Sequence, residues 1–93
     1  MEKTLSNTSV AEVTRDVVDV VVVGDGDLFK VLSKAYSKNQ GWMKSTKAME
    51  IPGVGCVVQI TTQQGENVAE ALTFVPGVKI VDDLNRGRKL ISL

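Results

Sequence analysis

Residues 56–81, CVVQITTQQGENVAEALTFVPGVKIV, contain three apolar segments separated by two short stretches that include glycine. The first two segments, residues 56–62 and 68–75, have the alternation and the β-branched content that favour extended strands. Gly65 lies in the polar stretch between them, and Pro76-Gly77 supplies a second turn signal. The pattern therefore predicts consecutive antiparallel strands joined by tight turns.

The same pattern continues on both sides of this stretch. Residues 42–51 alternate between two faces, after a turn-like segment at 38–41 and before Pro52-Gly53-Val54-Gly55. Downstream, residues 82–87 are predicted to form a loop, and residues 88–93 a closing strand. We therefore expect strands along most of the chain's second half.

Residues 28–38 fit two interpretations. Leu28, Val31, Leu32, Ala35 and Tyr36 have helical spacing, with Asp27 as a possible N-cap. The alternation in this segment equally fits a strand. The Asp-Gly turn signal before it favours the strand, because a two-residue connection leads into a return strand.

The N-terminal third predicts a tail and then a first strand. Residues 1–12 are mostly polar and are expected to form a flexible tail, which leaves 13–93 as a single small domain. The valine-rich segment 16–23 favours a strand, and Gly24-Asp25-Gly26-Asp27 favours a hairpin turn after it.

The fold class predicted from these elements is mainly β. The chain has 93 residues, 16 of them valine and 4 aromatic, which suits a small antiparallel β-barrel or curled meander of five to seven short strands. The alternative is an α+β fold with one helix at 28–38.

Composition excludes several classes of site. The chain has no histidine and one cysteine, so a histidine-based triad, an internal disulfide and a two-cysteine metal site cannot form. The pairs Asp25/Asp27 and Asp82/Asp83 lie where turns are predicted, and Cys56 opens an apolar strand. We expect no enzyme activity, no cofactor and no bound metal. The longest apolar run is Val20–Val23, so we also expect a cytoplasmic protein without a membrane span.

Basic charge is concentrated in one segment. The net charge is zero, but residues 28–49 contain five lysines and no acid, interleaved with aromatic residues. Lysines that follow phosphates, together with aromatic rings on which bases stack, are typical of proteins that bind single-stranded nucleic acid with little sequence specificity. The candidate contacts, with two arginines of the C-terminal loop added, are Lys30, Lys34, Tyr36, Lys38, Trp42, Lys44, Lys47, Arg86 and Arg88.

The alternative function is a protein–protein interaction module without a nucleic-acid role, such as a virion-like structural subunit or an inhibitor of another protein. Zero net charge, the lack of catalytic groups and unpaired strand edges favour it. Under either hypothesis a homodimer is expected, because a short valine-rich chain gains by burying surface against a copy.

Three short segments resemble the small single-stranded-DNA-binding proteins of filamentous phages. They are Ser37-Lys38-Asn39-Gln40-Gly41 followed by Trp42, then Val57–Thr61, and Val75-Pro76-Gly77, which together make up 14 of the 93 residues. The acidic, valine-rich first third departs from that pattern. The resemblance implies a dimeric β-barrel that coats single strands, with Tyr36, Lys38, Trp42 and Lys44 in contact with nucleic acid.

Overall fold

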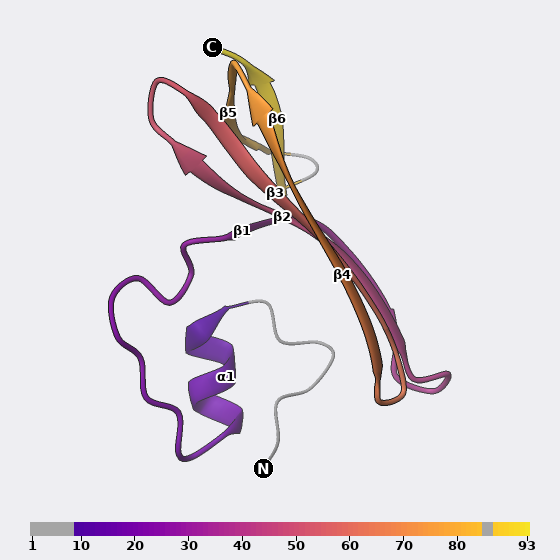
Figure 1. Ribbon diagram of the computed structural model, residues 1–93. Coiled ribbons are helices and arrows are strands. Elements are labelled where there is room, and N and C mark those ends of the chain that lie inside the picture. Colours follow the sequence, from indigo (N-terminus) through magenta and orange to yellow (C-terminus); the bar gives the residue numbers. More distant parts are fainter. Residues whose placement is uncertain (1–8, 85–86) are drawn as a thin grey trace.

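Six antiparallel strands in two sheets make up most of the protein. The computed structural model describes residues 9–84 and 87–93, and Figure 1 shows a long twisted sheet with a short hairpin at one end. The prediction of a mainly β fold with a curled meander is confirmed, and the sheets do not close into a barrel. The larger sheet has the order β1 (Lys30–Ser37), β2 (Trp42–Ile51), β3 (Gly55–Gln64) and β4 (Asn67–Pro76); β5 (Val78–Asp83) pairs with β6 (Gly87–Ser92).

The β3–β4 hairpin forms where the sequence predicts it. Gln64 pairs with Asn67 across a two-residue connection, and pairing continues without a shift to Gly55 opposite Pro76. Gly65 has a φ of 58°, and a left-handed residue at the first turn position matches the twist of a two-residue hairpin. The glycine in the turn therefore sets the register of this pair of strands.

The larger sheet has two distinct faces. Residues that pair directly in antiparallel strands point to the same side, so the pairs Ala48–Val58 and Glu50–Cys56 define one face. The β5–β6 hairpin packs there, and we call it the hairpin face. The opposite face carries Lys47 and Gln59, which lie near helix α1 (Val10–Asp16). We call it the helix face.

The buried core is small and lies under the hairpin. Among the described residues, three apolar side chains are buried: Ala48, Cys56 and Val58. The Glu50 carboxylate accepts a hydrogen bond from the Ile80 N–H at 2.7 Å, which anchors β5 to the sheet. Partly buried apolar side chains surround this core, namely Leu32, Val75, Val78, Ile80 and Leu90.

The N-terminal third differs from its prediction. A strand was expected at residues 16–23, but α1 ends at Asp16 and an irregular segment follows it. The helix begins at Val10, within the range expected to be a tail, because the Ser9 hydroxyl accepts the Glu12 N–H at 3.2 Å. Ser9-Val-Ala-Glu12 has the spacing of a helix capping box, which accounts for a helix start in the range expected to be a tail.

The segment between α1 and β1 is irregular and unpaired, with turns at 18–19 and 26–27, and the hairpin predicted at 24–27 does not form. Val18 and Val23 are each 92% exposed, because none of the described strands pairs with this segment. The two aspartates of this turn stabilise local backbone instead. Asp25 accepts the Asp27 N–H, and the Asp27 carboxylate accepts the Val10 N–H at the start of α1, at 2.7 Å.

Residues 30–37 form a strand, so the alternative helix at 28–38 is wrong. β1 pairs with β2 from Lys30 opposite Ala48 to Ser37 opposite Trp42. The register shifts between Val31 and Ser33, so Leu32 is an extra residue on β1. A bulge of this kind lets Leu32 reach the core while the strand continues.

The small core makes stability sensitive to single methyl groups. Val58→Ala is expected to lower the free energy of unfolding by about 1–3 kcal/mol, because it opens a cavity between the sheet and the hairpin. Val21→Ala removes the same atoms from a side chain that is 86% exposed, and its effect should stay within about 0.5 kcal/mol. Urea unfolding followed by circular dichroism measures both, and equal losses would contradict the position of the core.

Candidate interaction site

Strand β4 lies at one edge of the larger sheet and is exposed along almost its whole length. Of its ten residues, only Val75 is partly covered. On the helix face, Val68, Leu72 and Phe74 are 56%, 63% and 47% exposed. An apolar strand of this length with an open edge is an unusual feature for a protein that acts alone.

The backbone of β4 has free hydrogen-bonding groups. A two-residue turn closes on a hydrogen-bonded pair, here Gln64 and Asn67, and such pairs then alternate along the hairpin. The residues between those pairs therefore direct their N–H and C=O groups away from β3. In the described part of the chain no hydrogen bond reaches the outward groups of these residues, which are Val68, Glu70, Leu72 and Phe74.

The opposite edge of the sheet is protected. β1 contains the bulge at Leu32 and the charged residues Lys30 and Lys34. Arg88 of β6 also donates to the Val31 carbonyl at 3.2 Å. Bulges, lysines and a covering side chain are the features that keep a strand edge from pairing with another chain, and β4 has none of the three.

The predicted nucleic-acid contacts are divided between the two faces. Pairing with β2 places Lys34, Tyr36 and Lys47 on the helix face. Lys30, Trp42 and Lys44 lie on the hairpin face. Lys38 lies in the turn between β1 and β2, Arg88 is in β6, and Arg86 lies outside the described residues. The structure therefore does not gather these side chains into one groove.

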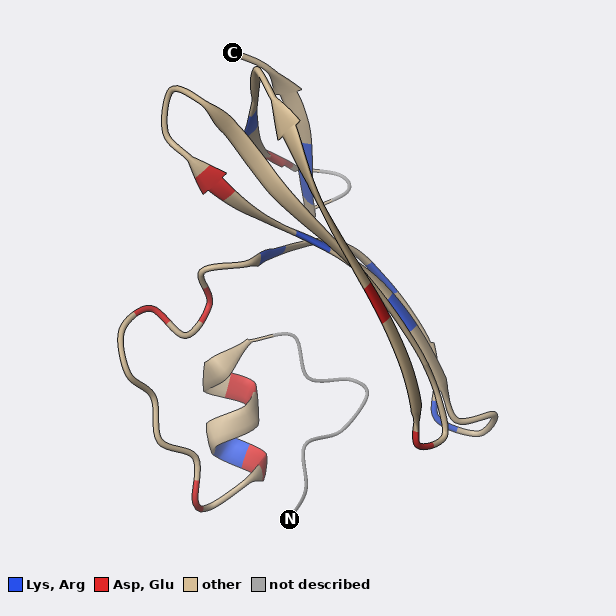
Figure 2. Ribbon diagram, viewed as in Figure 1, with Lys and Arg blue, Asp and Glu red and all other residues tan. Residues whose placement is uncertain are grey.

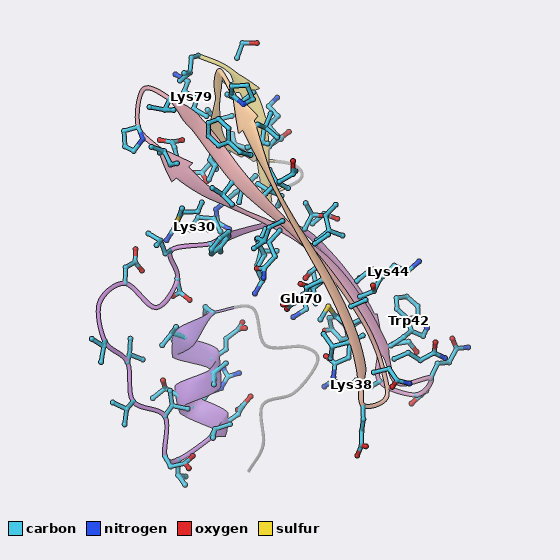
Figure 3. All side chains as sticks on the ribbon, in the orientation of Figure 1. Lys30, Lys38, Trp42, Lys44, Glu70 and Lys79 are labelled. Atoms are coloured by element: carbon cyan, nitrogen blue, oxygen red, sulfur yellow. The ribbon has the colours of Figure 1, made fainter. Side chains whose placement is uncertain are left out.

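Trp42 and Lys44 do share a surface. Both lie at the end of the hairpin face that is far from β5 and β6, and Figure 3 shows them on the side opposite Glu70. The Trp42 indole N–H donates to the Gln40 side chain at 2.9 Å, and the ring is partly exposed. Of the predicted set, these two side chains lie near each other on one face of β2.

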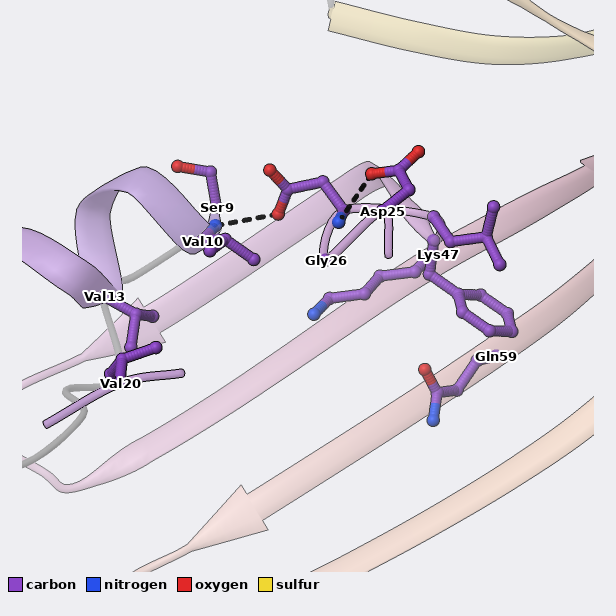
Figure 4. A pocket seen from close by; sticks show the side chains of 11 residues that line it. Ser9, Val10, Val13, Val20, Asp25, Gly26, Lys47 and Gln59 are labelled. Carbon is purple, nitrogen blue, oxygen red and sulfur yellow. Dashed lines mark hydrogen bonds between the residues drawn. The ribbon is translucent and has the colours of Figure 1, made fainter. Parts of the chain in front are cut away.

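The N-terminal segment is mainly acidic, whereas the sheet carries both charges. Figure 2 shows acidic residues along α1 and the segment after it, one basic residue in α1, and residues of both signs on the strands. Where the two meet, a cavity of about 480 Å³ is lined by apolar residues such as Val13 and Phe29, and the Lys47 side chain extends into it toward α1 (Figure 4). The cavity shows that the N-terminal segment packs loosely on the helix face.

The residues considered for chemistry have structural roles. Asp82 and Asp83 lie at the end of β5, where they pair with Arg88 and Lys89 at 3.8 Å in each case. Cys56 is fully buried. In the described residues no group of three carboxylates or thiols is arranged to hold a metal ion, and no helix there is long and apolar enough to cross a membrane.

Burial raises the pKa of the Cys56 thiol above its ordinary value of 9.0, and the nearby Glu50 carboxylate raises it further. The thiol therefore stays protonated at neutral pH and is a poor nucleophile. The neutral thiol also contributes to packing, since its Sγ lies 3.7 Å from the Val78 carbonyl oxygen as a weak donor.

The raised pKa predicts a loss of stability at alkaline pH. The contribution of the buried, neutral Cys56 thiol to the free energy of unfolding is fully present below its ordinary pKa of 9.0. This contribution is lost as the pH rises from 9.0 toward the raised pKa, because the same thiol ionises first in the unfolded chain. Between pH 7 and pH 10 the unfolding free energy should fall more for the wild type than for Cys56→Ala, under reducing conditions. Identical pH dependence in the two proteins would contradict this account.

Comparison with known proteins identifies a family. The model of the Lockin family matches residues 1–91, which is nearly the whole chain. The chain belongs to the Lockin family. No curated protein and no solved structure matches it. The description of the Lockin family names no activity.

The exposure of β4 was not predicted from the sequence. Residues 68–75 were expected to form a strand, and that prediction is confirmed. What identifies the site is the position of β4 at an edge of the sheet, together with the exposure of its apolar side chains, which no element of the described residues covers. A signal was present in the sequence, since this ten-residue strand contains a single charge, Glu70, whereas edge strands usually contain several.

Proposed function

We propose that this protein is a non-enzymatic interaction module that acts as the subunit of a homo-oligomeric assembly. One observation supports the proposal above others: the apolar side chains of β4 remain exposed while the described core contains only three buried apolar residues. Burial of apolar surface is the main favourable term in folding. A chain that leaves so much of it in water gains stability by docking against protein.

The overall dimensions support the same proposal. The accessible surface is 6613 Å², whereas a compact monomer of this mass exposes about 5,200 Å². The radius of gyration is 14.2 Å, against about 12 Å for a compact chain of this length. The surplus of about 1,400 Å² is spread over the chain, the exposed segment after α1 included, and it is larger than the roughly 800 Å² that one partner contributes to a stable interface.

Concentration-dependent stability tests the proposal. If folding is coupled to self-association, a hundredfold rise in protein concentration should raise Tm by about 5–10 °C, because mass action favours the associated native state. Differential scanning calorimetry with sedimentation equilibrium at the same concentrations measures both quantities. A Tm independent of concentration, with a monomer throughout, would refute self-association as the function.

A second candidate function, single-stranded nucleic-acid binding, is supported by the shared surface of Trp42 and Lys44. An aromatic ring beside an ammonium group offers stacking and phosphate contact together. This surface is on β2, with β3 between it and β4, and Lys44 lines a pocket together with Asn67, Val68 and Ala69 of β4. The two functions use different residues, but their surfaces are neighbours. The contribution of Lys30, Lys34 and Lys47 would be small, since they are separated from Trp42 by the sheet or by the length of a strand.

Tryptophan fluorescence tests the second candidate. Titration with a short oligothymidine should quench Trp42, and affinity should fall by about 0.7 log unit per log unit of salt for each phosphate contact. Lys44→Ala should weaken binding severalfold. Lys79→Ala removes a lysine at the opposite end of the molecule (Figure 3) and should leave binding unchanged. Absence of quenching at low salt, or equal losses in both variants, would refute this function.

A further inference from the structure

We infer that two copies of this chain pair through strand β4, antiparallel across a two-fold axis at Ala71, and form one continuous eight-stranded sheet. The inference rests on the proposed self-association and specifies its surface, symmetry and register. The starting observation is that β4 is the unprotected edge, since β1 carries a bulge and is covered by Arg88.

Backbone hydrogen bonding selects the register. The outward-directed residues of β4 are Val68, Glu70, Leu72 and Phe74. With Ala71 opposite its own copy, Val68 faces Phe74 and Glu70 faces Leu72, so every outward N–H and C=O finds a partner. If the second copy were shifted by two residues toward the end of β4, Pro76 would lie opposite Val68. Proline has no N–H to donate, so the Val68 carbonyl would lose its hydrogen bond. The Ala71-centred register therefore satisfies the most groups.

Side chains favour the same register. Val68 and Phe74 are both exposed on the helix face, and each would cover the other across the new strand pair. Glu70 would face Leu72 rather than the Glu70 of the other copy, which avoids direct repulsion between carboxylates. Ala71 would lie in a non-hydrogen-bonded pair, where the Cα atoms approach to about 4.5 Å, and its small side chain permits that approach.

A disulfide probe tests the axis directly. In Ala71→Cys, two thiols would meet across the axis at a distance that a disulfide spans, so oxidised glutathione should link most of the protein as covalent dimers. Ala69→Cys is the matched control, because Ala69 lies on the same face of β4 and is also exposed. Its copies would lie about four residues apart along the strand, roughly 13 Å, and should not be linked.

The two variants separate the possible outcomes. Linkage of Ala71→Cys alone, with native circular dichroism, supports the inference. If the wild type is a dimer but both cysteine variants are linked, or neither is, the inference is overturned, because the copies then associate through another surface or register. The proposed function would survive that result. A wild-type protein that stays monomeric would overturn both. Cys56 is fully buried, so the unmodified chain should give no linked species.

A charge pair provides a second test that needs no oxidation. In the inferred register, residue 72 of each copy faces Glu70 of the other, so the dimer contains two such pairs. A glutamate at position 72 would repel Glu70 and a lysine would attract it. Leu72→Glu should therefore weaken dimerisation at least tenfold relative to Leu72→Lys at low salt. The two variants remove the same exposed leucine and differ in the sign of the added charge. Sedimentation equilibrium measures the difference, which should shrink at high salt. Equal dissociation constants at low salt would exclude this register.

Discussion

The unequal lengths of the two sheets determine which apolar surface is buried. β2, β3 and β4 each have ten residues, whereas β5 and β6 have six, so the hairpin is about 14 Å shorter than the strands that it crosses. It covers the end of the hairpin face that carries Ala48, Cys56 and Val58. The rest of that face, with Ile60 at 51% exposure, stays open. The core is therefore confined to one end of the molecule.

The two edges of the larger sheet differ because of where the chain goes next. β4 continues through Gly77 into β5, which returns over the hairpin face and brings β6 beside β1. Arg88 can then donate to the Val31 carbonyl, so one edge is covered by the C-terminal strand. Among the described residues no further strand pairs with the outer edge of β4. Protection of β1 and exposure of β4 are thus two consequences of one topology.

Sequence reasoning predicted the parts of the fold that local signals determine. Turns at Gly41, Gly65 and Gly77 delimit β2 to β5 within a few residues of the prediction. The prediction for residues 16–23 was wrong because β propensity produces a strand only where another strand pairs with it.

The residues predicted to contact nucleic acid lie on two faces of the sheet, again because of strand pairing that the sequence does not show. Lys30 and Lys34 are four apart and would share one face of a regular strand, but the bulge at Leu32 places them on opposite faces, and local sequence does not reveal a bulge.

Pairing through β4 would produce an assembly that ends by itself. A two-fold axis uses the same edge of both copies, so no second β4 edge remains to recruit a third. The outer strands of the joined sheet would be the two β1 strands, whose bulge, lysines and Arg88 contact oppose further pairing. The helix face would then present a continuous apolar row through Val57, Phe74 and the Val68 of the other copy. In the proposed dimer, the edge that is exposed in one chain would thus lie at the centre of a closed assembly.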